Sequence, residues 1–171
     1  MSAHKDEAGS LGAALGAAAE GVAFYDLANV VAADVRVKVT FEDLGRRKRS
    51  QLERLESVAG PGVRDAAPRP GVYPLGMVAK VDCYVCGLTV EAASMPNQCP
   101  NCGAARYAFE QEIALAKAWA VASAAARKVA ALYRAAAPKA PADVRALLEA
   151  LAAEEDALAA EADREIAELR T

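Results

Sequence analysis

The chain has 171 residues and a formal net charge of −3 at pH 7, so it has no overall attraction to nucleic acid or to an anionic membrane surface. Hydrophobic residues make up 54% of the chain but aromatic residues only 5%, which favours closely packed helices over sheets. No uncharged apolar run approaches the roughly 20 residues that cross a bilayer, and residues 1–10 do not resemble a secretory signal. We therefore expect a cytoplasmic protein with no nucleic-acid or membrane partner.

The first part of the chain predicts a disordered tail followed by a helical hairpin. Residues 1–9 are assigned to the tail and residues 10–58 to the hairpin. Its first helix, to about Val31, has Ser10 available as N-cap, and its second runs from about Asp34 to Ser57. Gly12 and Gly16 give the first helix a face of small residues, which suits close contact with another helix or a dimer partner.

The middle of the chain combines a linker with a cysteine motif. Residues 59–78 are rich in proline and glycine and predict a linker. Residues 79–109 follow, with short β-like pieces and the only cysteines of the chain: Cys83, Cys86, Cys99 and Cys102. They form two Cys-x-x-Cys-Gly knuckles, whose thiolates can converge on one tetrahedral metal ion. Gly87 and Gly103 can take the positive φ that curls each knuckle.

The identity of the metal is left open by the ligands. In a reducing compartment a doubled Cys-x-x-Cys indicates a metal site rather than disulfides. Four thiolates suit both iron and zinc.

The last part of the chain, residues 110–171, predicts a second helical hairpin. A long alanine-rich helix is expected from Ala108 to Ala136, and a last helix begins at Pro141 or Asp143 and runs to about Arg170. Two amphipathic hairpins cannot bury their apolar faces alone, so we expect a four-helix bundle. The fold class is therefore mainly α with a small β/knuckle insert, and Tyr25 and Tyr133 are expected to hydrogen-bond across the bundle.

The charges of the bundle are unevenly distributed. The second helix is basic and the last helix acidic, so the two can lie side by side within the chain or across a dimer, or can simply be solvated faces. The basic run at residues 46–49 stands beside Glu42, Asp43 and Glu53 and lacks interleaved aromatic residues, which disfavours nucleic-acid binding.

Residues 81–87 and 98–104, ending near Phe109 and Glu110, resemble the rubredoxin-like domain of rubrerythrins. A weaker resemblance links residues 20–25, 37–38 and 41–44 to the first hairpin of the rubrerythrin bundle, and residues 132–133, 144–149 and 151–152 to the second. The resemblance implies a four-helix ferritin-like bundle. The rubredoxin-like domain usually precedes or follows that bundle, whereas here it lies between the two hairpins.

The resemblance also implies that a di-iron site has been lost. The family supplies one Glu from the first and third helices, and here those positions are Ala18 and Ala126. The Glu-x-x-His motifs of the second and fourth helices become residues 48–51 and 155–158, of which only Glu155 keeps a ligand. The single histidine, His4, lies in the expected tail. Di-iron peroxidase, oxidase or ferroxidase activity is therefore not expected, and Glu20, two residues out of register, is the one acid that could weaken this conclusion.

The replaced positions predict a specific contact. Lys48 and Glu155 would face each other across the lost site, so we expect a buried or half-buried ion pair with Gln51 nearby. Such a pair would occupy the place of the two metal ions.

We expect the function to reside in the four cysteines. One iron per chain, cycling between Fe3+ and Fe2+, would make the protein a one-electron carrier that serves a redox partner protein. The bundle would be scaffold, docking surface and the interface of a homodimer, with exchange of hairpins between subunits made easy by the linker. The alternative is a structural Zn2+ ribbon in a helical interaction protein, and an enzyme with an unrecognised active site is a third interpretation.

Overall fold

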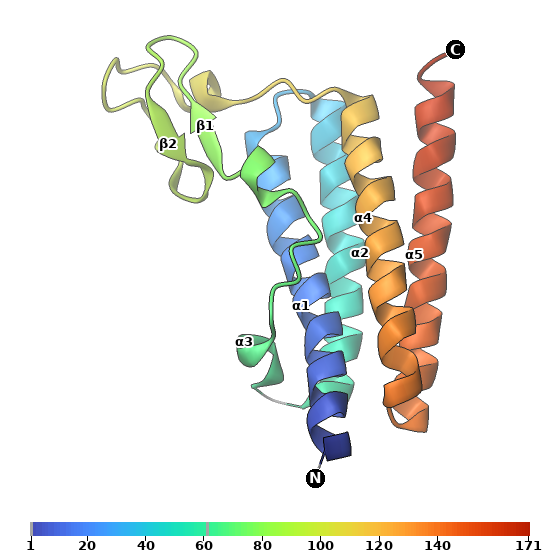
Figure 1. Ribbon diagram of the computed structural model, residues 1–171. Coiled ribbons are helices and arrows are strands. Elements are labelled where there is room, and N and C mark those ends of the chain that lie inside the picture. Colours follow the sequence, from blue (N-terminus) through green and yellow to red (C-terminus); the bar gives the residue numbers. More distant parts are fainter. Residues whose placement is uncertain (1, 61) are drawn as a thin grey trace.

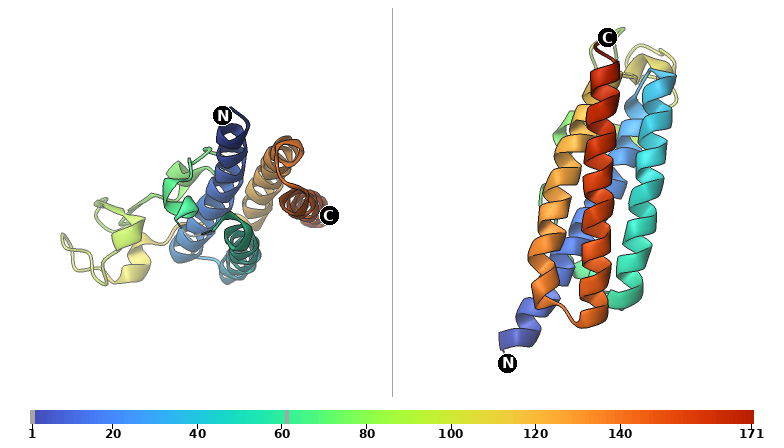
Figure 2. Two further views of the ribbon diagram at one scale, coloured as in Figure 1. Left: turned by 90° about the horizontal axis from the view of Figure 1, so that it is seen from below. Right: turned by 90° about the vertical axis from the view of Figure 1, so that its right-hand side faces the viewer.

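A computed structural model describes residues 2–60 and 62–171, and four long helices lie side by side in this part of the chain (Figures 1 and 2). They are α1 (Ser2–Val31), α2 (Val35–Ala59), α4 (Leu115–Ala136) and α5 (Ala142–Glu168). The single turn α3 (Val63–Ala66) and a two-stranded antiparallel sheet, β1 (Lys80–Asp82) and β2 (Thr89–Glu91), lie between the two hairpins. The fold is therefore mainly α with a small β insert, as expected. No helix among the described residues is long and apolar enough to cross a membrane.

The helix boundaries follow from local chemistry. Asp34 is the N-cap of α2, where its carboxylate accepts the Arg36 N–H at 2.8 Å. Gly60, with φ of 81°, ends α2 in a conformation that costs glycine little. The short turn between α4 and α5 contains Pro138 and Pro141, which terminate one helix and start the next.

Helix α2 lies beside α5, and ion pairs join the two. Arg47 binds Glu161 with an N···O distance of 2.7 Å, and Arg54 binds Glu154 at 2.6 Å. The basic helix thus neighbours the acidic helix within one chain. These side chains remain partly exposed, so each pair is worth no more than about 1 kcal/mol.

Residues 68–73, which we call the strap, pack along α1 (Figure 1). A Cβ on Gly16 would lie 1.7 Å from the carbonyl oxygen of Pro68, and a Cβ on Gly21 would lie 2.8 Å from the hydroxyl oxygen of Tyr73. The glycines of α1 therefore make room for the strap. This finding corrects the expectation that the small-residue face of Gly12 and Gly16 receives another helix, since Pro68 also lies beside Gly12.

Some expected boundaries were wrong. Helix α1 begins at Ser2, so residues 2–9 are helical, and Ser10 lies inside the helix rather than capping it. Alanine, lysine and glutamate in this segment are strong helix formers, and no proline stops them. The linker contains the turn α3 and a 3-10 turn at Leu75–Met77. Helix α4 begins only at Leu115, because residues 110–114 run as extended chain beside the α1–α2 connection.

Candidate metal centre

The two cysteine knuckles have the same backbone geometry. The Gly87 N–H donates to the Cys83 carbonyl at 2.7 Å, and the Gly103 N–H donates to the Cys99 carbonyl at 2.8 Å. Both glycines have positive φ, 77° and 75°, as predicted from their positions after the second cysteine. Each knuckle is thus a tight loop that turns its two thiols to the same side.

The sulfur atoms of the four cysteines form a compact cluster. The Sγ atoms of Cys83 and Cys102 are 3.8 Å apart, and those of Cys86 and Cys99 are 3.6 Å apart. All four lie within 4.8 Å of one another. A tetrahedral ion with metal–sulfur bonds of about 2.3 Å requires sulfur–sulfur distances of about 3.8 Å, whereas a disulfide requires about 2.0 Å. The arrangement therefore fits one tetrahedral ion held by four thiolates.

Hydrogen bonds to sulfur stabilise negative charge in this cluster. The Asn101 side chain, followed by the Leu88 N–H, lowers the pKa of the Cys86 thiol to about 6. The Ala104 N–H acts in the same direction on Cys102, but burial and hydrogen bonds to the other cysteines together raise the pKa of that thiol to about 12. The Cys86 thiolate is thus easy to form, whereas the Cys102 thiol keeps its proton at neutral pH. A bound cation would release the Cys102 proton, so metal affinity should rise with pH.

The cluster lies near the surface. Cys83 and Cys99 are buried, whereas Cys86 and Cys102 are exposed. Tyr84 and Val85, in the same loop as Cys86, expose 68% and 57% of their surface. One edge of the site can therefore be reached by another protein.

The cysteine module is attached to the α1–α2 end of the bundle (Figure 1). The Gln111 N–H donates to the Val31 carbonyl at 2.7 Å, and the Ala33 N–H donates to the Gln111 carbonyl at 2.9 Å. Lys38 and Glu110 add an ion pair at 3.2 Å. No periodicity marks this pairing of extended segments in the sequence, so the sequence alone does not predict it.

The bundle interior contains the predicted ion pair. Lys48 and Glu155 are essentially fully buried and hydrogen-bonded to each other, and Lys48 Nζ also donates to Gln51 Oε1 at 3.2 Å. Burial lowers the pKa of Lys48, although the charge of Glu155 opposes the change. Ala18 and Ala126 are buried as well, at the positions where the resemblance places lone glutamates. The Lys48 ammonium group therefore neutralises the Glu155 carboxylate.

Glu20 has a structural partner. Its carboxylate accepts the N–H groups of Gly71 at 2.9 Å and Tyr73 at 2.8 Å, one on each oxygen. Glu20 is 3% exposed and therefore fastens the strap to α1. Both oxygens that could have bound a metal are engaged by backbone.

Three tyrosine hydroxyls in the interior lack protein partners. Among the described residues, the buried hydroxyls of Tyr25, Tyr73 and Tyr133 and the Oε2 atom of Glu155 have no hydrogen-bond partner. The expectation that Tyr25 and Tyr133 hydrogen-bond across the bundle was therefore wrong. Tyr73 was not expected in the interior, because its sequence context of proline and glycine indicated a linker.

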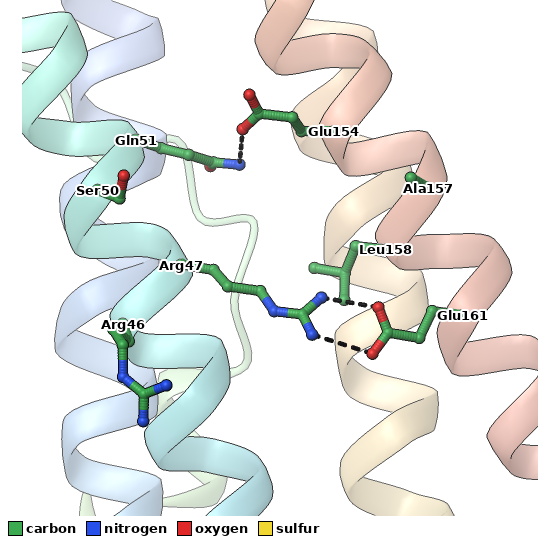
Figure 3. A pocket seen from close by; sticks show the side chains of 8 residues that line it. All are labelled: Arg46, Arg47, Ser50, Gln51, Glu154, Ala157, Leu158 and Glu161. Atoms are coloured by element: carbon green, nitrogen blue, oxygen red, sulfur yellow. Dashed lines mark hydrogen bonds and ion pairs between the residues drawn. The ribbon is translucent and has the colours of Figure 1, made fainter.

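A groove of about 440 Å³ lies between α2 and α5 (Figure 3). It is lined by Arg46, Arg47, Ser50, Gln51, Glu154, Ala157, Leu158 and Glu161. Gln51 belongs to both regions, because its Oε1 accepts from buried Lys48 and its Nε2 donates to Glu154 at 3.4 Å. Gln51 therefore contacts both the buried ion pair and the acidic side of the groove.

Comparison with protein-family models matches residues 82–110 to the rubrerythrin, rubredoxin-like domain. No curated protein and no solved structure matches the chain. The matched segment contains all four cysteines, which are the one group of potential metal ligands found among the described residues. Residues 82–110 are thus similar to the rubredoxin-like domain of rubrerythrins, with four cysteines placed as a metal site inside a mostly helical chain.

Proposed function

We propose that Cys83, Cys86, Cys99 and Cys102 bind one iron ion and that the protein carries single electrons to or from a partner protein. The observation that carries the proposal is the sulfur arrangement, with two Sγ–Sγ distances of 3.6 and 3.8 Å in a segment similar to a rubredoxin-like domain. Bound iron would supply a one-electron couple between the ferric and ferrous states.

The protein groups around the thiolates suit such a couple. The N–H groups of Leu88 and Ala104 face Cys86 and Cys102, so they favour additional negative charge at the sulfurs. The knuckles are fastened by backbone hydrogen bonds, including Cys83 N–H to the Leu88 carbonyl at 2.8 Å. A rigid ligand set keeps its geometry when the charge of the site changes, which favours fast electron transfer.

The exposed edge of the site indicates where the partner would dock. Cys86 and Cys102 reach the surface beside the exposed Tyr84 and Val85, so a partner can approach the sulfurs directly. The helices would then serve as a degenerate ferritin-like scaffold. A homodimer and a cytoplasmic location remain predictions from the sequence.

A structural zinc site is the second candidate, and one observation favours it. The cysteine module is tied to the α1–α2 connection by the backbone pairing of Gln111 with Val31 and Ala33. A redox-silent ion held there would stabilise the junction between the two hairpins.

Metal content and the visible spectrum of the purified protein separate these candidates. We expect about one iron per chain and thiolate-to-iron charge-transfer bands that bleach with dithionite and return in air. The Cys83→Ser/Cys99→Ser variant should lose both metal and bands. One zinc and no colour, in protein expressed with ample iron, would contradict electron transfer and support the structural role.

A further inference from the structure

Four buried polar atoms in the interior of the bundle have no hydrogen-bond partner among the residues that the structure describes. They are the hydroxyl oxygens of Tyr25, Tyr73 and Tyr133 and the Oε2 atom of Glu155. They come from α1, the strap, α4 and α5, so four separate segments contribute one atom each. All four residues are buried, and Tyr73 and Glu155 expose 4% and none of their surface.

The four groups are close to one another. The rings of Tyr25 and Tyr73 have centroids 5.6 Å apart in an edge-to-face arrangement. The negative charge of Glu155 acts on all three tyrosines and, after burial itself, contributes to raising the pKa of each hydroxyl. The hydroxyl of Tyr73 is also held against α1, because Gly21 leaves no side chain between them.

We propose that these four groups form a binding site for an internal water molecule. Buried polar groups are almost always hydrogen-bonded, and internal waters bind where two to four such groups converge. The hydrogen-bonding capacity of the four groups matches that of water. Glu155 Oε2 can only accept a hydrogen bond, while each tyrosine hydroxyl can donate and accept. A water molecule can donate to the carboxylate and accept from the hydroxyls.

The charges around the four groups favour a neutral polar ligand over an ion or an apolar molecule. The carboxylate of Glu155 is already neutralised by Lys48, so the site offers a further cation no net charge. An anion would be repelled by the carboxylate, and an apolar molecule would leave the four groups without partners. A neutral ligand that both donates and accepts hydrogen bonds, such as water, remains.

A high-resolution crystal structure of the full, metal-loaded protein tests the proposal directly. We expect a water-sized density peak, without anomalous signal, about 2.6–3.2 Å from Glu155 Oε2 and from at least one tyrosine hydroxyl. Direct hydrogen bonds from the tyrosines to Glu155 with no molecule between them would overturn the proposal. A peak with a metal's anomalous signal, or the density of an organic molecule, would overturn it as well.

Thermal unfolding of Tyr133→Phe provides a second test, with Tyr107→Phe as the control because Tyr107 is 63% exposed. A hydroxyl that binds internal water contributes to stability, so Tyr133→Phe should lower Tm by about 2–4 °C, whereas the control should leave it unchanged. A hydroxyl that is truly unpartnered costs stability, so an unchanged or higher Tm for Tyr133→Phe would refute the proposal.

Discussion

Removal of the ammonium group of Lys48 should destabilise the bundle strongly. In the Lys48→Met variant the Glu155 carboxylate would remain buried, with its nearest cation gone. Removing one partner of a buried ion pair typically costs about 3–5 kcal/mol, because the other charge stays in a medium of low polarity. Gln51, the other hydrogen-bond partner of Lys48, carries no charge and cannot replace the ammonium group.

The size of the effect can be converted into a melting temperature. Unfolding entropy near 60 °C is about 2.1 cal/mol/K per residue, which gives about 0.36 kcal/mol/K for a chain of 171 residues. Lys48→Met should therefore lower Tm by about 8–14 °C. The Lys48→Met/Glu155→Leu double variant should lose much less, because apolar replacement of both partners is often neutral or stabilising.

Unfolding followed by circular dichroism at matched metal content checks this order of stabilities. Arg49→Met is the control, since Arg49 neighbours Lys48 in α2 but forms an exposed pair with Asp26, and it should cost no more than about 1 kcal/mol. If the single variant were as stable as the double variant, Lys48 would not be compensating a buried charge, and the reasoning would fail.

Three other perturbations have defined outcomes. Above pH 10 the unfolded tyrosines ionise while the buried ones, with raised pKa, stay neutral, so stability should fall with pH by about 1.4 kcal/mol per pH unit for each of the three. Tyr133→Phe should remove about a third of this slope, and an unchanged slope would contradict the assigned burial. Gly16→Ala should lower stability by about 1–3 kcal/mol through the clash with the strap carbonyl, whereas Gly9→Ala, which meets nothing within 4 Å, should be neutral or stabilising. Metal removal by a chelator, or Cys83→Ser, should increase hydrogen exchange over residues 80–110 but leave most helical circular dichroism, and loss of the helical signal would show that the metal holds the bundle together.

The sequence by itself determined the elements whose signals are local. Cys-x-x-Cys-Gly specifies a knuckle, since two thiols and a glycine of positive φ within five residues leave few other geometries, and both knuckles formed as expected. Apolar residues at helical spacing identified the four long helices. The Lys48–Glu155 pair was predicted through the resemblance to the rubrerythrin bundle, which places a lysine and a glutamate at facing core positions, where each charge compensates the other.

Only the tertiary structure decided how the connecting segments are used. Proline and glycine in residues 59–78 indicated a linker, but the strap packs into α1 because Gly16 and Gly21 leave room for it and Glu20 accepts two of its N–H groups. Those contacts join residues about 50 positions apart, so no local sequence pattern predicts them. The same packing brings Tyr73 to Tyr25, Tyr133 and Glu155, and the interior polar site exists only after these segments have come together.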